Sequence, residues 1–238
     1  MTAVERIRNF RAERLGRIIA EETPVPLKEG ARIVLHIVPF GAFDPTTKVD
    51  FSVLQQNASL RLRKPILGRG ENERYNFDGL VIYDRLAQLP SPHTYLQVFR
   101  NGIIEAVEAY LLNISEQKQI LSVKGYDFEE MLIEALDRFL SLQSLVGVEP
   151  PLFVMLTLLR VSGYVMYVRD RFHFQSLEYT HPIDRDVLLI PELTVESFEL
   201  EAADFMRPAF DAVWNASGWP RSMNYDEKGK WEDLSISV

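Results

Sequence analysis

The chain of 238 residues contains no cysteine. Disulfide bonds, thiolate metal sites and cysteine nucleophiles are therefore excluded, and the composition agrees with a reducing compartment. Long hydrophobic runs are also absent, because the longest apolar stretch, Leu152–Leu159, ends at Arg160 and falls far short of the roughly 18 residues of a membrane span. Arginines interrupt the N-terminal segment, which therefore lacks the apolar core of a signal peptide. We expect a cytoplasmic protein with no membrane association.

Basic residues are in the minority. The chain has 26 lysines and arginines against 34 aspartates and glutamates, and a net charge of −8. Such a charge argues against general coating of nucleic acid, which needs a basic surface. Residues 1–20 nevertheless carry +3, so the remainder carries −11, the difference between −8 and +3. The charged residues of this first segment are Arg6, Arg8, Arg11, Arg14 and Arg17, with Glu5 and Glu13.

Common catalytic motifs are missing as well. The chain has no GxGxxG or GxxxxGK[ST] phosphate loop, no GxSxG nucleophile motif and no HExxH zinc motif. The glycines of Gly68-Arg69-Gly70 precede no helical pattern, so they do not form a phosphate loop of that kind. We therefore expect no cofactor and favour a protein without catalytic activity of its own.

The order of predicted elements indicates the fold class. Residues 1–22 predict a basic N-terminal helix over 3–20, ended by Thr23-Pro24-Val25-Pro26. Residues 197–216 predict a final helix, bent near Pro208, and an aromatic tail over 217–238 that packs on the body. Apolar and β-branched runs predict strands at Arg32–Val38, Tyr75–Tyr83, 152–159, 163–168 and Ile183–Leu193. We expect a single α+β domain, residues 1–238, with a mostly antiparallel sheet.

A hairpin is predicted around Asn101-Gly102. This dipeptide supplies the positive φ angles of a type I′ turn between two apolar strands. The expected register places Phe99 opposite Ile104 and Leu96 opposite Val107. A helix over 103–112 is the competing interpretation, because glutamates and alanines there favour helix.

Residues Asp127–Leu145 predict a central amphipathic helix. Asp127 is the expected N-cap, with Glu130 at the capping-box position. Apolar side chains recur every three or four residues at Phe128, Met131, Leu132, Ala135, Phe139 and Leu142, while Glu129, Glu130, Glu134 and Asp137 are expected to face water.

Two groups of residues are candidates for metal chemistry. His173 and His181 stand on either side of an expected turn and could bind a divalent metal if the fold brought them together. Acidic residues on two neighbouring predicted strands could hold Mg²⁺ for phosphoester hydrolysis. These catalytic candidates are Asp78, Asp84, Glu105 and Glu108. Scattered histidines and strand carboxylates are most often hydrogen-bonded within the core or exposed to solvent. We therefore favour a protein without a metal site.

The arginines of the first helix are candidates for partner binding. Arg11 and Arg14 fall on the same side of the helix as Ile7 and Ile18, which is unusual for a simple core helix. The favoured explanation is that their stems pack while their guanidinium groups pair with carboxylates of the chain. The alternative is a docking face for another protein or for phosphates. The partner-binding candidates are Arg8, Arg11, Arg14, Arg17, Trp219 and Trp231.

Several segments along nearly the whole chain resemble a known type of bacterial protein. They are Phe10-Arg11-Ala12-Glu13-Arg14-Leu15, Thr23-Pro24-Val25-Pro26-Leu27, Val34-Leu35-His36-Ile37-Val38-Pro39, Arg74-Tyr75-Asn76-Phe77-Asp78-Gly79, Phe99-Arg100-Asn101-Gly102, Leu189-Ile190-Pro191-Glu192 and Phe210-Asp211-Ala212-Val213-Trp214-Asn215. Their order and spacing resemble the region downstream of the AlbA_2 (Schlafen-type) domain in bacterial putative ATP- or DNA-binding proteins. The AlbA_2 motifs themselves are not found here, so the resemblance implies an accessory region and transfers no nucleotide or nucleic-acid role.

Three functions follow as hypotheses. The favoured one is a non-catalytic interaction module with a protein partner or a second copy of itself. The second is a metal-dependent phosphoesterase or nuclease that uses the strand carboxylates. The third, disfavoured by the net charge, is a nucleic-acid-binding protein that uses the first helix with Arg61, Arg63, Lys64 and Arg69.

Overall fold

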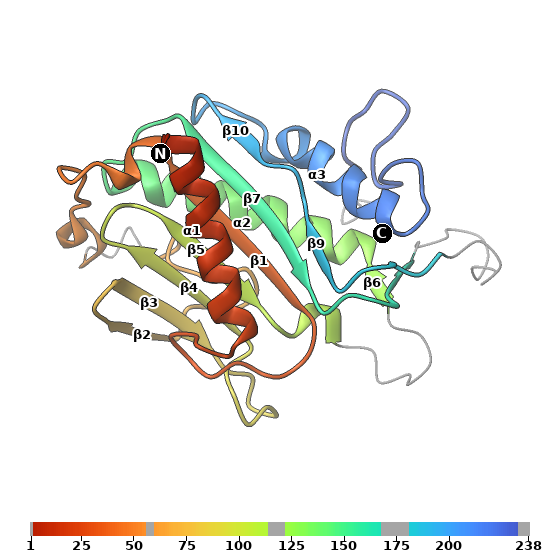
Figure 1. The fold of residues 1–238 in the computed structure, drawn as a ribbon, viewed down its shortest axis with the longest axis horizontal. Coiled ribbons are helices and arrows are strands. Elements are labelled where there is room, and N and C mark those ends of the chain that lie inside the picture. Colours follow the sequence, from red (N-terminus) through yellow and green to blue (C-terminus); the bar gives the residue numbers. More distant parts are fainter. Residues whose placement is uncertain (1, 56–59, 114–121, 168–180, 233–238) are drawn as a thin grey trace.

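A central antiparallel sheet lies between helices on both of its faces in the computed structural model, which describes residues 2–55, 60–113, 122–167 and 181–232. Helix α1 (Ala3–Ile19) covers one face, and α2 (Gly125–Leu145) and α3 (Ala202–Ala216) cover the other (Figure 1). This arrangement confirms the α+β class with a mostly antiparallel sheet. Among the described helices, none is long and apolar enough to span a membrane.

The large sheet has eight strands in the order β10-β7-β1-β5-β4-β3-β2, with β9 pairing to β7 beside β10. All of its neighbouring strands are antiparallel. Its strands are β1 (Arg32–Pro39), β2 (Asn72–Tyr75), β3 (Gly79–Asp84), β4 (Thr94–Phe99), β5 (Ile104–Glu108), β7 (Leu152–Leu159), β9 (Val187–Leu189) and β10 (Leu193–Val195). A separate parallel pair joins β6 (Ser122–Lys124) to β8 (Val165–Tyr167).

The first helix begins at a complete capping box. Thr2 accepts a hydrogen bond from the Glu5 N–H, and the Glu5 carboxylate accepts one from the Thr2 N–H, so two of the free donors of the first turn are satisfied. The buried stripe of α1 then packs Ile7, Leu15 and Ile18 on the sheet. The helix ends where Glu21 adopts a positive φ of 62° and turns the chain toward β1.

The larger core lies on the α2–α3 side of the sheet. Because both faces of β1 are covered, all eight of its residues are buried, which explains its nearly continuous apolar sequence. Phe128 of α2 and Phe210 of α3 meet edge to face with ring centroids 5.9 Å apart. The apolar stripe predicted for the central helix is confirmed at Phe128, Leu132 and Phe139, all fully buried.

The β4–β5 hairpin is confirmed, but its register is shifted by one residue from the expected one. Val98 lies opposite Ile104, and Tyr95 lies opposite Val107. The Gly102 N–H donates to Phe99 O and the Phe99 N–H to Ile103 O, so the loop has three residues and only Gly102 has a positive φ. This is a type I turn followed by a glycine bulge, which Asn-Gly suits as well as the expected type I′ turn.

Two expected strands are each divided in two. The segment Tyr75–Tyr83 turns back on itself at residues 76–78 and supplies the end of β2 and most of β3. The segment Ile183–Leu193 breaks after Leu189, so that β9 and β10 pair with successive parts of β7. Pro191 lies in the break, where it lacks the N–H that a continuous ladder would require.

Candidate functional site

A cluster of four buried polar residues joins α1 to the sheet; we call Arg14, His36, Tyr95 and Glu105 the Glu105 cluster. Arg14 donates from Nε and Nη2 to the two oxygens of the Glu105 carboxylate, both at 2.8 Å. The Tyr95 hydroxyl donates to Oε1 at 2.7 Å, and His36 Nε2 lies 3.0 Å from Oε2. Glu105 and His36 have no exposed surface. The one-residue shift of the hairpin register creates this cluster, because it turns Tyr95 to the same face as Glu105.

The protonation states of Glu105 and Tyr95 are fixed by their contacts. Burial alone would raise the pKa of Glu105, but hydrogen bonds from Arg14 and His36 outweigh it and lower that pKa to about 2. Burial and the Glu105 charge raise the pKa of Tyr95 well above its ordinary value. Glu105 is therefore a permanent anion and Tyr95 a permanent donor near neutral pH. Groups whose pKa values lie so far from 7 are poorly suited to general acid–base catalysis. The arrangement is suited instead to holding α1 on the sheet.

The arginines predicted to bind a partner make contacts within the chain. Arg11 and Arg14 are each only 8% exposed, which excludes them from a partner surface. Arg11 donates to the Thr157 hydroxyl at 2.8 Å and to Leu156 O at 2.6 Å, next to the break between β9 and β10. Arg8 pairs with Glu192 and Arg17 with Glu13 of the same helix. The favoured sequence interpretation, packed stems with guanidinium groups paired to carboxylates, is confirmed for Arg14, whereas the buried Arg11 guanidinium binds a hydroxyl and backbone carbonyl oxygens.

The four candidate catalytic carboxylates do not meet. Asp84 and Glu108 share a face of the sheet, but strand β4 separates them, which places them about 10 Å apart. Glu105 points to the opposite face, toward α1, and Asp78 is exposed in the turn at the far end of β3 from Asp84. A two-metal site holds its ions about 4 Å apart, so this placement gives the phosphoesterase hypothesis no support.

Two of these carboxylates bind backbone amides instead. Asp84 accepts hydrogen bonds from the N–H groups of Arg69, Gly70 and Glu71, with the last two at 2.8 and 2.6 Å. The glycine-containing loop is therefore a nest of amides that an internal carboxylate fills. Glu108 accepts from the N–H groups of Tyr110 and Leu111 at 2.7 and 2.8 Å.

Of the two candidate histidines, only His181 lies in the described part of the chain. His181 is exposed, and its ring lies beside Gly218, where an added Cβ would come within 2.5 Å of it. His173 lies outside the described residues. In the described part of the chain, no three histidine, aspartate or glutamate side chains are grouped closely enough to hold a metal ion.

A second buried carboxylate, Glu129 of α2, anchors the C-terminal tail. It has no exposed surface and was expected from the helix pattern to face water, which is wrong. Glu129 accepts hydrogen bonds from Trp214 Nε1 at 2.7 Å and Trp231 Nε1 at 3.2 Å. The Ser222 hydroxyl at 2.7 Å and the Asn224 amide at 2.9 Å complete its shell. Four donors from residues 214–231 therefore converge on one oxygen pair.

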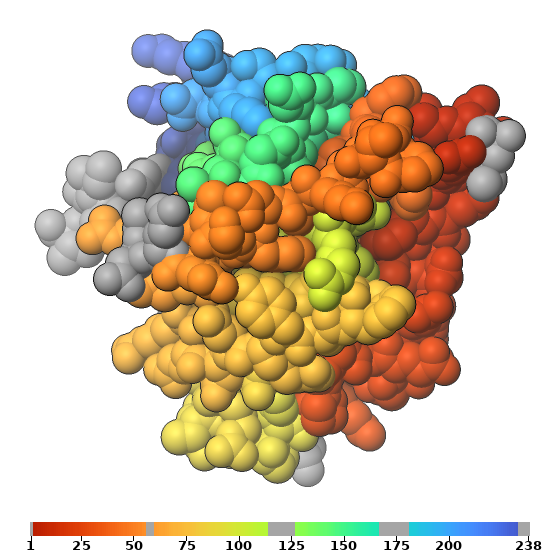
Figure 2. All heavy atoms as spheres, turned by 90° about the vertical axis from the view of Figure 1, so that its left-hand side faces the viewer, coloured from red at the N-terminus to blue at the C-terminus, as the bar shows by residue number. Residues whose placement is uncertain are grey.

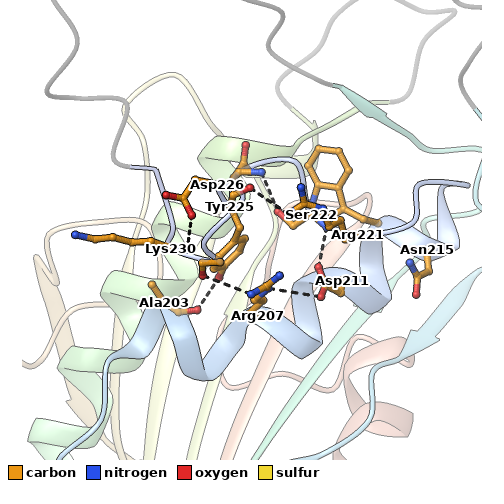
Figure 3. A network of polar contacts seen from close by, with 12 residues as sticks. Ala203, Arg207, Asp211, Asn215, Arg221, Ser222, Tyr225, Asp226 and Lys230 are labelled. Carbon is orange, nitrogen blue, oxygen red and sulfur yellow. Dashed lines mark hydrogen bonds and ion pairs between the residues drawn. The ribbon is translucent and has the colours of Figure 1, made fainter.

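Further contacts hold the tail along α3 (Figure 3). The Tyr225 hydroxyl donates to Ala203 O at 2.6 Å, and the Ser222 N–H donates to the Asp211 carboxylate at 2.8 Å. The Arg207 guanidinium lies over the Tyr225 ring, 5.2 Å from its centroid. The expected packing of the tail on the body is thus observed over residues 217–232.

The two tryptophans proposed for partner binding belong to this internal packing. Trp231 donates to Glu129, and Trp219 meets Trp214 edge to face with centroids 5.9 Å apart. Both are partly buried against the main core. Their described contacts are with Glu129 of α2 and Trp214 of α3, which makes them part of the internal packing.

The surface feature that sequence analysis missed is an exposed aromatic at the tip of the β2–β3 hairpin. Phe77 is 94% exposed, yet its turn is held firmly. Asn76 Oδ1 accepts the Gly79 N–H at 2.8 Å, and Arg100 donates from Nε to Phe77 O at 3.0 Å. At Gly79, with a φ of +153°, an added Cβ would lie 2.1 Å from Val98 O, so only glycine fits.

Neighbouring residues extend this surface, which we call the hairpin end (Phe51, Tyr75, Phe77, Asp78 and Arg100). Tyr75 is 52% exposed and meets Phe51 edge to face at 6.0 Å. Figure 2 looks onto this end, where the β2–β3 hairpin (gold), the β4–β5 turn (yellow-green) and residues 40–55 (orange) lie side by side. The Asn76–Gly79 and Phe99–Gly102 segments, two of those that carry the sequence resemblance, meet here.

Comparisons with protein-family models, with curated proteins and with solved structures find no match to this chain.

Replacing Arg14 by methionine leaves Glu105 buried without its cation. We expect Arg14→Met to lower the free energy of unfolding by about 3–5 kcal/mol, measured by urea denaturation. Arg17→Met is the matched control on the same helix, because its exposed pair with Glu13 should contribute less than about 0.5 kcal/mol. Equal effects of the two substitutions would contradict a structural role for the Glu105 cluster.

Glu108 gives the stability a defined pH dependence. Burial raises its pKa from the ordinary 4.5 to about 7, against the hydrogen bonds from backbone N–H groups. The folded state then keeps a proton that the unfolded state releases near pH 4.5, so this stabilisation is lost as pH rises through 7. We expect Glu108→Gln to remove about 2–3 kcal/mol of the wild-type decrease in unfolding free energy between pH 5 and pH 8. An unchanged difference between the two pH values would overturn this assignment.

Removal of the Glu129 carboxylate should release the tail. Glu129→Ala leaves four donors without their acceptor, two of them on the buried residues Trp214 and Ser222, so we expect a loss of about 3 kcal/mol or more in unfolding free energy. Trypsin should also cleave at Arg221, Lys228 and Lys230 at least about tenfold faster, because cleavage requires local opening. The control is Glu134→Ala, an exposed position on the same helix. Cleavage at the wild-type rate would show that Glu129 does not hold the tail.

Proposed function

We propose that this chain is an accessory protein-interaction module, without catalytic activity of its own, that binds a protein partner through the hairpin end. The observation that carries the proposal is Phe77, 94% exposed on a turn that hydrogen bonds hold in one conformation. A large aromatic side chain on a fixed turn is the type that dominates binding energy at interfaces, because it buries a large area and has only two side-chain torsions to fix. Isolated exposed apolar residues are common, but here Tyr75 and Phe51 adjoin the tip.

The use of the polar groups supports the same proposal. The buried carboxylates of Asp84, Glu105, Glu108 and Glu129 each accept two or more hydrogen bonds from the fold itself. Groups engaged in this way are stabilising the structure, and their substitution should affect stability before chemistry.

The basic residues offer limited support for nucleic-acid binding. Arg11 and Arg14 lie on the buried face of α1. Arg63 is 7% exposed and pairs with Glu73. Together with the net charge of −8, this leaves a protein partner as the better candidate.

The resemblance to the region downstream of AlbA_2 domains suggests the first partner to test. Two of the segments that carry it, Arg74–Gly79 and Phe99–Gly102, form the hairpin end, where a companion domain would find an exposed aromatic. We propose that the partner is an AlbA_2-type protein encoded in the same genome, with a second copy of this chain as the alternative.

The test is a titration of purified AlbA_2-type protein into this chain by calorimetry, with ultracentrifugation to detect self-association. We expect Phe77→Ser to weaken binding at least about tenfold, the usual effect of truncating an aromatic anchor, with a change in unfolding free energy below about 0.5 kcal/mol. Leu189→Ser is the matched control, because Leu189 is a 59% exposed apolar residue on β9, near the opposite edge of the sheet from β2. A strictly monomeric wild-type chain that binds no such partner would contradict the proposal.

A further inference from the structure

Strand β2 is the last strand of the sheet, next to the hairpin end, and among the described strands it pairs only with β3. Its pairing determines which backbone groups point outward. The Asn76 N–H donates to Gly79 O, which makes Asn76 and Gly79 a hydrogen-bonded pair. In an antiparallel ladder such pairs alternate, so Arg74 with Val81 and Asn72 with Tyr83 are also bonded pairs. The N–H and C=O groups of Glu73 and Tyr75 therefore point away from the sheet.

The side chains of β2 are exposed on both faces. All four residues of the strand are exposed, and the described contacts of its side chains beyond β3 are those of Glu73 with Arg63, of Arg74 with Pro24 O and of Tyr75 with Phe51. Glu73 and Tyr75 lie on the α2 side of the sheet, opposite Ile82 and Leu80 of the main core, and Arg74 lies on the α1 side, opposite Val81. An open edge with outward backbone groups is the surface to which extended segments add as new strands.

Charge argues against a second copy of this chain as the added strand. In a two-fold symmetric antiparallel pair, residues that face each other must lie on the same side of the sheet, so each register is centred on one residue paired with its own copy. The two registers that overlap β2 most fully are centred on Glu73 and on Arg74. The first places two glutamates opposite each other and the second two arginines, and both arrangements are unfavourable.

We propose that β2 binds an extended segment of the partner protein as an additional antiparallel strand. The partner segment carries an apolar side chain opposite Tyr75, an acidic one opposite Arg74 and a basic one opposite Glu73. Tyr75 supplies apolar contact, and the opposite charges at Arg74 and Glu73 set the register. The outward N–H and C=O groups of Glu73 and Tyr75 form the backbone hydrogen bonds with the added strand. This inference rests on the proposed function and specifies the chemistry of its partner.

The free protein provides the first test. By hydrogen exchange followed with NMR, the amides of Glu73 and Tyr75 should exchange rapidly, whereas the amide of Arg74, bonded to β3, should be protected. Strong protection of Glu73 and Tyr75 in the free chain would mean that the edge is already occupied and would overturn the proposal.

The second test uses a defined probe, a fluorescein-labelled peptide with the core Val-Asp-Lys between threonine-rich flanks. Binding should protect the Glu73 and Tyr75 amides, and exchanging the Asp and Lys of the peptide should weaken binding at least about tenfold. Peptide binding without protection at these two amides would overturn strand addition, as would equal affinity for the charge-exchanged peptide.

A pair of substitutions at one position separates the backbone from the side chain. Glu73→Pro removes the outward N–H, which an edge strand tolerates, and should weaken peptide binding at least about tenfold. Glu73→Ala is the control, because it removes the same carboxylate and its pairing with Arg63 but keeps the N–H, so its affinity should stay within about threefold of wild type. Equal affinities of the two variants would exclude the outward ladder. If Glu73→Pro unfolds the chain, the wild-type amide protection decides the question.

The same variants distinguish failure of this inference from failure of the proposed function. If the AlbA_2-type protein loses binding with Phe77→Ser but binds Glu73→Pro normally, it docks on the hairpin end without strand addition, and only the inference fails. If wild-type protein shows no binding to that partner while the peptide still protects β2, the choice of partner fails and the edge remains a strand acceptor.

Discussion

The ion pair between Glu105 and Arg14 is the contact on which the placement of α1 depends. A carboxylate with no exposed surface receives two hydrogen bonds from Arg14, one from Tyr95 and a close contact from His36. Apolar side chains could give a buried helix interface equal or greater stability, so the value of such a group lies in specificity. Together with the hydrogen bonds from Arg11 to β7, this pair ties α1 to one position on the sheet.

A second buried carboxylate, Glu129, accepts several hydrogen bonds on the opposite face of the sheet. Glu129 binds four donors from the end of the chain, as Glu105 binds donors from its beginning, so a buried carboxylate holds each terminal segment to the body. Burial raises the pKa of Glu129, while that of Glu105 is lowered, because a guanidinium faces Glu105 and only neutral donors face Glu129. Among the described residues, the β2 edge and the tip at Phe77 stay exposed beside these internally bonded segments.

Local sequence signals identified the elements well where periodicity and length agreed. The three helices, the buried strands β1 and β7 and the β4–β5 hairpin follow from apolar spacing and from Asn-Gly. Local signals failed where two turns suit the same residues. Asn101-Gly102 fits a two-residue loop and a three-residue loop equally, and the structure has the register in which Tyr95 reaches Glu105 and Gln97 bonds with Asn76. These partners, Glu105 and Asn76, lie outside the turn, so the residues of the turn alone cannot indicate the contacts.

The sequence by itself determined the α+β class and the absence of cysteine chemistry, because these follow from composition and from the local periodicity of apolar residues. It left open whether the arginines of the first helix pack within the chain or face a partner. Tertiary structure decided which charged groups are buried. The helix pattern placed Glu129 toward water, and only the return of the tail, some ninety positions later in the chain, explains its burial. Phe77 shows the reverse case, an apolar residue in an apolar-looking strand that the turn at Asn76–Gly79 directs into solvent. Burial depends on what else folds against a residue, and that information lies in distant parts of the chain.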